Sequence, residues 1–385
     1  MKKIITYKGK YIENKVLLCT VLSSLVSLPY IFIIYFHDIL GIRDLWGFHR
    51  AFHVINYLDF GFTKRALVGT FIKPLNTYTN IDFDILILLT YIILLFIFCY
   101  LFWSLCIKSG APRLVQTALI LTPATFQFIG FDSPRSSELV WLILFSCWCL
   151  YINRLTYIDY RNSFITGLIV SLSLLSYEGS FILIFPSIFL VIISKLGRRI
   201  MLNKLLIISF MLVPVITVLL SLHYHGQFEN GSIVIRQLLD KVDITIEDTL
   251  SEVVVNDLIR SNLSLIKNND VNWFSNNPIF ILYILTWIYA NYVELKNTTN
   301  LKFNLLLTSF SFSGILLCLV AVDYSRYIAL SLIVNIMVLC LIKKDFNWSK
   351  NKVWQIISLF AIMGPVGCAG SINPFPLWKF IFDLF

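Results

Sequence analysis

Eleven long apolar runs, separated by short charged segments, set the strongest constraint on how this chain can fold. An apolar run of roughly 20 residues can cross the hydrocarbon core of a membrane as a helix. Only helices and closed barrels satisfy their own backbone there. The sequence therefore predicts an all-α fold, a polytopic membrane helical bundle of about eleven transmembrane helices. The expected spans are residues 16–36, 84–107, 114–130, 139–152, 163–177, 181–195, 202–222, 279–293, 303–322, 327–342 and 353–371.

The scarcity of charged residues supports the same conclusion. Of 385 residues, 58% are hydrophobic and 14% are charged, and the mean hydropathy is +0.79. Soluble domains carry roughly 25% charged residues, and they have too few interior positions to hide so much apolar surface. Composition thus excludes a soluble enzyme, a disordered protein and a nucleic-acid-binding domain. We expect residues 1–385 to form a single integral membrane domain.

The basic residues indicate which side of the membrane each connection faces. If the N-terminus is cytoplasmic, the inner connections hold 19 of the 31 Lys and Arg residues, as the positive-inside rule requires. The first apolar run is then a retained signal anchor. Two long connections, about 37–83 and 223–278, lie on the periplasmic side together with all five histidines. Any chemistry is therefore expected to face outward.

Two tight outer turns place a carboxylate three residues before a guanidinium. Asp132 precedes Arg135 between the third and fourth spans, and Asp323 precedes Arg326 between the ninth and tenth. Ionisable groups near membrane depth usually have a partner or a function. One interpretation is a pair of local salt bridges that end helices. The other is a site for an anionic substrate, where the guanidinium binds phosphate and the aspartate orients it or acts as a base.

Glu178 lies between two short apolar runs, directly before Gly179. Desolvation there should raise the pKa of its carboxyl group, which would suit a general base. The alternatives are a solvated loop acid and a carboxylate that caps the following helix. Glu138, at the start of the fourth span, is interpreted more simply as a partner of the positive helix N-terminus.

Lys64 and Arg65 form a third candidate feature in the first long outer connection. Two adjacent cations near the outer membrane surface could hold a lipid pyrophosphate. They could equally extend toward phospholipid headgroups. His49, Arg50 and His53 share one helix face, but their spacing fixes no further metal ligand. No metal site is predicted.

Motifs for cofactors and for familiar hydrolases are absent from the sequence. It contains no GxxxxGK[ST] phosphate loop, no HExxH, no GxSxG and no dinucleotide fingerprint. The outer connections contain no cysteine, so no disulfide framework supports them. Because soluble nucleotide sugars are cytoplasmic, glycosyl transfer at an outward-facing site would need a lipid-carried donor. No cofactor is expected.

In architecture, the chain resembles the Wzy-type O-antigen and capsular polysaccharide polymerases of bacterial inner membranes. The resemblance lies in size, in the number of spans, in Phe-, Ile- and Tyr-rich helices and in two enlarged outer connections that bear arginines. That family has no shared sequence motif, so no residue is carried over from it. The chain also looks similar to membrane glycosyltransferases of the GT-C kind, with a long first outer connection and an acidic residue near its start, Asp38 or Asp44.

The polymerase resemblance implies that glycan passes from one undecaprenyl pyrophosphate carrier to a sugar hydroxyl on another. The leaving pyrophosphate needs cations, for which Lys64, Arg65, Arg135 and Arg326 are the candidates. The attacking hydroxyl needs a base. The candidates for that base are Glu178, ranked first, Asp132 and Asp323.

The partners implied are the lipid-linked glycan, membrane lipids and a chain-length regulator, without nucleic acid. The GT-C alternative would use a lipid-linked donor for a single sugar and leaves a divalent metal open. A third alternative, a flippase for lipid-linked oligosaccharides, calls for charges in the middle of spans and a relation between halves. The spans here are nearly free of charge at their centres, which favours an enzyme.

Overall fold

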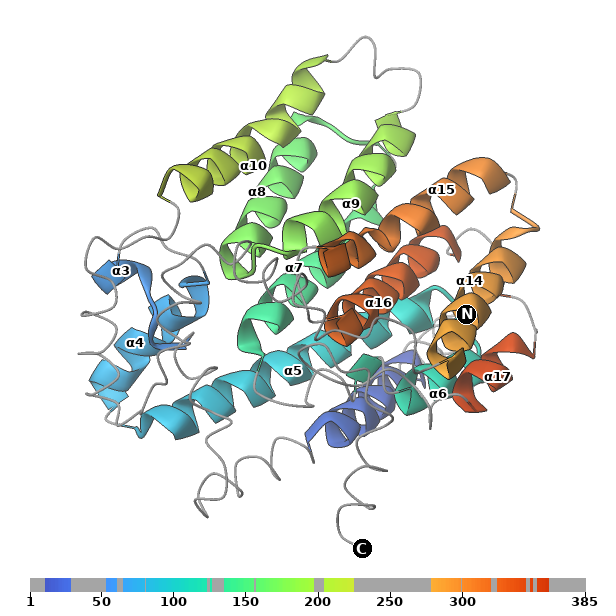
Figure 1. Ribbon diagram of the computed structural model, residues 1–385, viewed down its shortest axis with the longest axis horizontal. Helices are drawn as coiled ribbons and strands as arrows, with labels where there is room; N and C mark the ends of the chain where they lie inside the picture. Colours follow the sequence, from blue (N-terminus) through green and yellow to red (C-terminus); the bar gives the residue numbers. More distant parts are fainter. Residues whose placement is uncertain are drawn as a thin grey trace, which may run out of the picture.

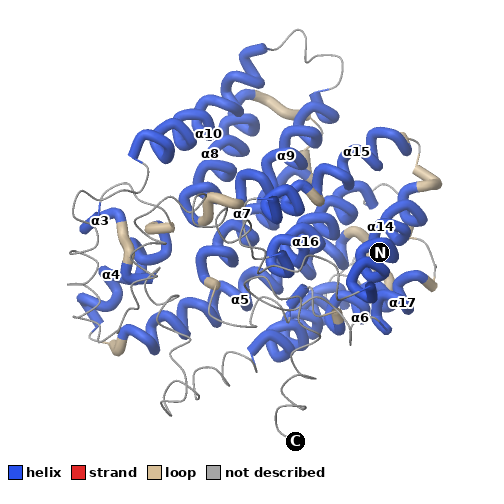
Figure 2. Tube along the Cα trace, in the orientation of Figure 1, coloured by secondary structure: helices blue, strands red, loops and turns tan. Residues whose placement is uncertain are grey.

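The computed structural model describes most of the apolar part of the chain. The described residues are 11–28, 53–60, 65–79, 81–122, 125–126, 135–155, 157–196, 204–224, 278–298, 300–319, 324–343, 347–348 and 352–359. Within these ranges every regular element is a helix and no strand occurs (Figure 2). The all-α prediction is confirmed for this part of the protein. Most of the outer connection 223–278 and residues 37–52 of the connection 37–83 lie outside the described residues.

The helices follow the apolar runs of the sequence closely. Each of the eleven predicted spans overlaps a described helix, and α5 begins and ends within one residue of its prediction. The elements are a first helix Tyr11–Leu28, α3 Tyr57–Phe60, α4 Leu67–Thr79, α5 Phe83–Lys108, α6 Arg113–Leu121, α7 Ser136–Ile152, α8 Tyr160–Ser176, α9 Ser180–Leu196, α10 Lys204–Tyr224, α14 Pro278–Leu295, α15 Leu301–Ser311, the 3-10 helix η3 Ser313–Leu319, α16 Tyr324–Lys343 and α17 Val353–Leu359.

Three of these helices are long and apolar enough to cross a membrane, which indicates a membrane protein. They are Tyr11–Leu28, α5 and the Arg326–Lys343 portion of α16. Eleven full spans are not confirmed, because several predicted runs form shorter helices. Within the predicted span 114–130, helix α6 ends at Leu121, and Thr122 adopts an extended conformation. The span 303–322 is divided at Phe312 into α15 and the 3-10 helix η3.

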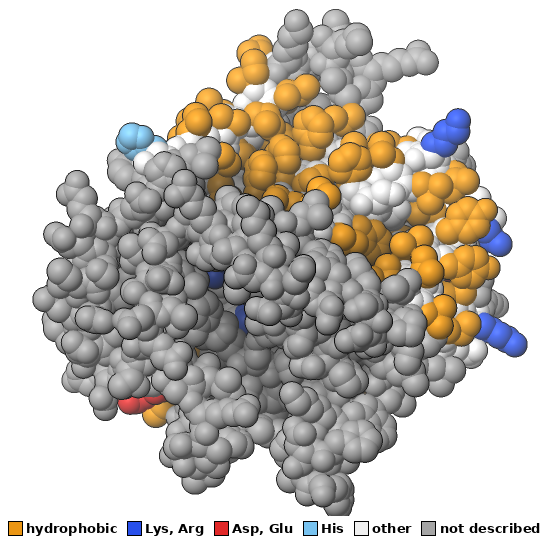
Figure 3. All heavy atoms as spheres, viewed as in Figure 1, with side chains coloured by type: hydrophobic (Ala, Val, Ile, Leu, Met, Phe, Trp, Pro, Cys, Tyr) orange, Lys and Arg blue, Asp and Glu red, His pale blue; other side chains and the backbone are white. Residues whose placement is uncertain are grey.

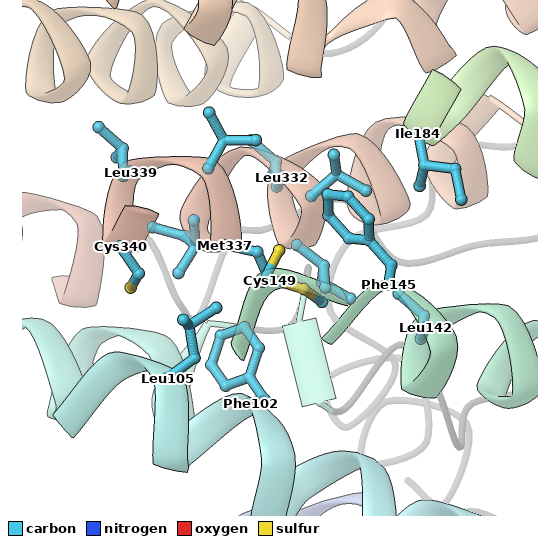
Figure 4. Close-up of a cluster of buried hydrophobic side chains, with 14 of the residues drawn as sticks. Phe102, Leu105, Leu142, Phe145, Cys149, Ile184, Leu332, Met337, Leu339 and Cys340 are labelled. Atoms are coloured by element: carbon cyan, nitrogen blue, oxygen red, sulfur yellow. The ribbon is translucent and has the colours of Figure 1, made fainter. Parts of the chain in front are cut away.

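Helix α16 forms the centre of the bundle. Its apolar window is 94% buried, against 39% for α5 and 33% for the first helix. In Figure 1, α16 lies among α5, α7, α9 and α15. Figure 4 shows Met337 and Cys340 of α16 in the same core as Phe102 of α5 and Phe145 of α7. Helix α16 packs against several neighbouring helices along its length. Its N-terminus and C-terminus therefore lie at the two ends of the packed core.

Polar side chains pin α16 to its neighbours inside this core. The Asn335 amide accepts a hydrogen bond from Trp287 Nε1 of α14 at 3.1 Å and donates one to Ser311 Oγ of α15 at 2.9 Å. Hydrogen bonds of this kind hold helices together where apolar packing alone gives little preference, as in lipid. Asn335 therefore specifies how three helices meet.

The outer faces of several helices remain apolar. On α10, α14 and α15 the exposed side chains include Leu212, Leu219, Leu285, Ile288 and Phe310. Figure 3 shows hydrophobic side chains covering the parts of the surface where Figure 1 places α10, α9, α15 and α14. Exposed apolar area on this scale marks an interaction surface, and on helices of this composition lipid is the expected neighbour.

Candidate functional site

The first residue of the candidate site is Arg65, which lies in the turn directly before α4. Its backbone has φ = 55°, which makes it the one non-glycine residue with positive φ in the described part of the chain. A Cβ atom makes this left-handed backbone conformation unfavourable. Residues held in such strained conformations cluster at functional sites. Helix α4 holds the turn close to the segment before α3. A Cβ added at Gly69 would lie 2.0 Å from the carbonyl oxygen of Ile55 and 2.6 Å from that of His53.

The guanidinium of Arg65 donates hydrogen bonds to the carboxylate of Glu178. Nε donates to Oε1 at 3.1 Å and to Oε2 at 3.0 Å, and Nη2 donates to Oε1 at 2.6 Å. The Arg65 side chain is 12% exposed and that of Glu178 is 40% exposed, so the cation lies inside and the carboxylate outside. Burial disfavours charge on Arg65, but the adjacent carboxylate outweighs it, and the pKa of Arg65 is raised above its ordinary value.

The turn that carries Glu178 joins α8 to α9. Tyr177 ends α8 in an extended conformation, and its N–H donates to the carbonyl of Ser173. Its ring folds back over Gly179, where an added Cβ would approach Tyr177 Cε1 to 2.6 Å. A side chain at position 179 would push this ring away. The glycine therefore allows Tyr177 to turn inward while Glu178 points toward solvent.

A second carboxylate, Glu138, receives two further arginines in the interior. Arg135 Nη1 lies 3.2 Å from Glu138 Oε1, and Arg326 Nη1 lies 3.4 Å from the same oxygen. The side chains are 3%, 11% and 6% exposed for Arg135, Arg326 and Glu138. A buried charge needs close partners because water does not reach it. Glu138 thus fixes the N-termini of α7 and α16 together.

Tyr177 joins the two ion-pair groups. The Arg65 Cζ atom lies 5.1 Å from its ring centroid and the Arg326 Cζ atom 5.8 Å, so two cations contact one aromatic ring. The Tyr177 hydroxyl donates to the Tyr327 hydroxyl at 3.3 Å, and Arg326 Nη2 donates to that same oxygen at 3.2 Å. We call these side chains the arginine cluster: Arg65, Arg135, Glu138, Tyr177, Glu178, Arg326 and Tyr327.

A buried histidine contacts the first turn of α7. His53 Nε2 and Ser136 Oγ are 3.0 Å apart, and both side chains are buried. Ser136 directly follows Arg135 in the sequence. The contact ties the segment before α3, and with it the Arg65 turn, to the helix that carries Arg135 and Glu138.

The structure brings together residues that the sequence offered as separate candidates. Arg65, Arg135, Arg326 and Glu178 all belong to the arginine cluster. The other three candidates, Lys64, Asp132 and Asp323, lie outside the described residues. The local pairs expected within the two turns involve these same aspartates and therefore stay predictions.

Two expectations about carboxylates are corrected by the geometry. Glu178 was expected to be desolvated, but 40% of its side chain is exposed and it is ion-paired with Arg65. Glu138 was expected only to complement a helix N-terminus, but it also bridges Arg135 and Arg326. The i, i+3 spacing from Arg135 was an available signal for one of these contacts. No local pattern could indicate the contact with Arg326 or the positions of Tyr177 and Tyr327.

Chemically, the arginine cluster is suited to an anion that carries several oxygens. Three guanidinium groups converge from three parts of the chain, and guanidinium groups bind phosphate with paired hydrogen bonds. Helices α7, α9 and α16 all begin here, and helix N-termini favour negative charge. Among the described residues, no group of three or more His, Cys, Asp and Glu side chains could hold a metal ion.

Comparisons with known proteins give no relative for this chain. No protein-family description, no curated protein and no solved structure matches it. The arginine cluster and the membrane character of the helices are therefore the features that indicate a function.

Proposed function

We propose that this protein is a membrane glycosyltransferase that joins undecaprenyl-pyrophosphate-linked oligosaccharide units, as in O-antigen or capsule assembly. The observation that carries the proposal is the contact of Arg65 and Arg326 with the Tyr177 ring beside the partly exposed Glu178, with Arg135 joined to Arg326 through Glu138. Arginines stabilise the charge that develops on a leaving pyrophosphate. A glutamate is a reasonable base for the attacking hydroxyl. The reaction calls for no nucleotide.

We further propose a multi-pass protein of the bacterial inner membrane with a cytoplasmic N-terminus and its site on the periplasmic face. The predicted topology puts positions 65, 135, 178 and 326 on the outer side, and these four residues belong to one cluster. Residues predicted to lie inside also meet. Lys343 contacts Glu294, and Trp348 donates to the carbonyl of Ser109. Residues predicted to lie on the same side of the membrane thus contact one another at each of the two sides. These contacts support the predicted topology.

The distribution of charge in the helices favours an enzyme over a flippase. In α16 the charged residues are Arg326 and Lys343, near its two ends, and in α5 they are Asp84 and Lys108. A transporter that moves a charged substrate through the bilayer needs polar groups along the path. The membrane-depth segments of these two helices carry no charged residue, whereas the charged groups gather at the ends.

The experiment is polymerisation by the purified protein in lipid nanodiscs with lipid-linked repeat units. The wild-type protein should form a ladder of products without added nucleotide. Arg135→Lys and Arg326→Lys should each lower the rate at least about tenfold, because a point charge does not reproduce the paired hydrogen bonds of guanidinium. Arg161→Lys, at an exposed position in the first turn of α8, is the matched control. Normal ladders from both cluster variants would contradict the proposal. A single sugar added per acceptor would favour the GT-C alternative.

A further inference from the structure

The two carboxylates of the arginine cluster differ in how firmly they are held. Glu138 is 6% exposed and lies between two arginines. Glu178 is 40% exposed, belongs to a turn and faces the Arg65 guanidinium from the solvent side. Displacing Glu138 would take a counter-ion from two buried cations, whereas Glu178 is the more exposed partner of its ion pair. Of the two carboxylates, Glu178 is therefore the one that an incoming anion can reach.

Arg65, unlike its partner, is fixed in place. Its backbone adopts the left-handed conformation at φ = 55°, and the guanidinium lies 5.1 Å from the centre of the buried Tyr177 ring. The Nε and Nη2 edge of Arg65 holds the Glu178 carboxylate. The same edge is the one that binds two oxygens of a phosphate. A diphosphate that bound to this edge of Arg65 would therefore compete with Glu178 for it.

We propose that the diphosphate of the lipid-linked donor displaces Glu178 from Arg65, and that this exchange turns Glu178 into the base for the acceptor hydroxyl. This inference rests on the proposed function. Before exchange, both oxygens of the Glu178 carboxylate accept hydrogen bonds from Arg65. The carboxylate is then a weaker base. After exchange it keeps its negative charge but no longer accepts hydrogen bonds from Arg65, and losing the stabilisation by this cation lets it accept a proton more readily. Catalysis is thereby coupled to donor binding.

The reaction step balances without any further reactant. The acceptor hydroxyl oxygen forms a bond to the anomeric carbon of the donor glycan as its proton passes to Glu178. The bond from that carbon to the diphosphate oxygen breaks, and its electron pair stays on the diphosphate beside Arg65. When the lipid diphosphate leaves, Glu178 loses the proton to water and pairs with Arg65 again.

Binding measurements on Glu178→Gln test the exchange directly. Glutamine is nearly the same size but neutral, so it competes weakly for Arg65. We expect this variant to bind farnesyl diphosphate about fivefold more tightly than wild type. A fivefold change in affinity corresponds to the free energy that a partly exposed ion pair contributes. It should also form product at least about a hundredfold more slowly. Inorganic pyrophosphate, titrated in parallel, distinguishes recognition of the diphosphate alone from recognition of a lipid-linked one.

Two further variants separate exchange from a general gain in positive charge. Asp82→Asn removes one negative charge at an exposed helix cap and should leave farnesyl diphosphate affinity unchanged. In an Arg65→Gln background, Glu178→Gln should not increase the affinity for farnesyl diphosphate, because the guanidinium for which the two anions compete is missing. Equal or weaker binding by correctly folded Glu178→Gln would overturn the exchange. If that variant binds tightly while wild type makes no glycan product, the exchange stands and the proposed function fails.

Discussion

Arg326 and Glu138 stand 188 positions apart in the chain, yet Arg326 Nη1 lies 3.4 Å from Glu138 Oε1 in the interior. The contact joins the N-terminus of α16, the most buried of the three long apolar helices, to the first turn of α7. Arg135 reaches the same oxygen from the position before α7. This shared oxygen makes the geometry of two arginines depend on one carboxylate.

Glu138→Gln should therefore destabilise the protein strongly. The substitution takes a buried counter-ion from Arg135 and Arg326, and breaking a buried ion pair costs about 3–5 kcal/mol. Unfolding of the purified protein in a denaturing-detergent titration measures this loss. Asp159→Asn is the control, because Asp159 caps α8 by accepting from the N–H of Asn162 and an asparagine can still do so. A Glu138→Gln protein as stable as this control would show that the shared oxygen carries little energy.

Gly69→Ala tests how the Arg65 turn is positioned. The added Cβ would lie 2.0 Å and 2.6 Å from two backbone carbonyl oxygens, and backbone cannot rotate away as a side chain can. Helix α4 must then move, and the Arg65–Glu178 pair should separate. We expect lower thermal stability and at least about a tenfold loss of glycan product, since misplacement by an ångström is costly to catalysis. Leu75→Ala, on an exposed position of the same helix, should keep both. Full activity in Gly69→Ala would mean that α4 does not position Arg65.

The positions of the helices could be predicted from sequence because each depends on one local property. An uninterrupted apolar run gives α5 nearly residue for residue. The break at Phe312 was not foreseen, because the segment around it stays apolar and hydropathy cannot distinguish an α-helix from a 3-10 turn. For the same reason, hydropathy alone does not tell which of the eleven apolar runs form full spans, and three are long and apolar enough among the described residues.

The candidate site could be predicted only in parts. Arg65, Arg135, Arg326 and Glu178 stood out because charge is rare in this chain. Their meeting depends on how α7, α9 and α16 pack, which no short sequence window contains. Tyr177 looked like one of many aromatic residues, although it contacts two of the arginines. Its contact with both cations depends on the packing of helices that are far apart in the sequence.

The opposite end of α16 offers a stability test that leaves the arginine cluster untouched. Lys343 Nζ lies 2.9 Å from Glu294 Oε2 and also donates to the carbonyls of Glu294 and Asn347. Trp354 Nε1 donates to the other carboxylate oxygen at 3.0 Å. Lys343→Met and Glu294→Gln should each destabilise the protein by about 3–5 kcal/mol, because each leaves a buried charge.

The double variant at this pair gives the sharper result. Replacing both charges leaves neither group uncompensated, so the double variant should be less destabilised than the sum of the two single variants. Denaturing-detergent titrations of the four proteins measure the coupling. Additive losses would show that Lys343 and Glu294 act independently despite their contact.

Orientation in the membrane can be tested at two exposed tyrosines. Tyr78, near the end of α4, is 86% exposed, and Tyr157, between α7 and α8, is 66% exposed. The positive-inside rule puts position 78 outside and position 157 inside. In intact spheroplasts, a membrane-impermeant maleimide should label Tyr78→Cys and should reach Tyr157→Cys only after the membrane is opened. The unsubstituted protein gives the background from its own eight cysteines. Because α4 follows directly from the Arg65 turn, labelling of position 157 and not of 78 would move the arginine cluster to the cytoplasmic face, where a periplasmic polymerase could not use it.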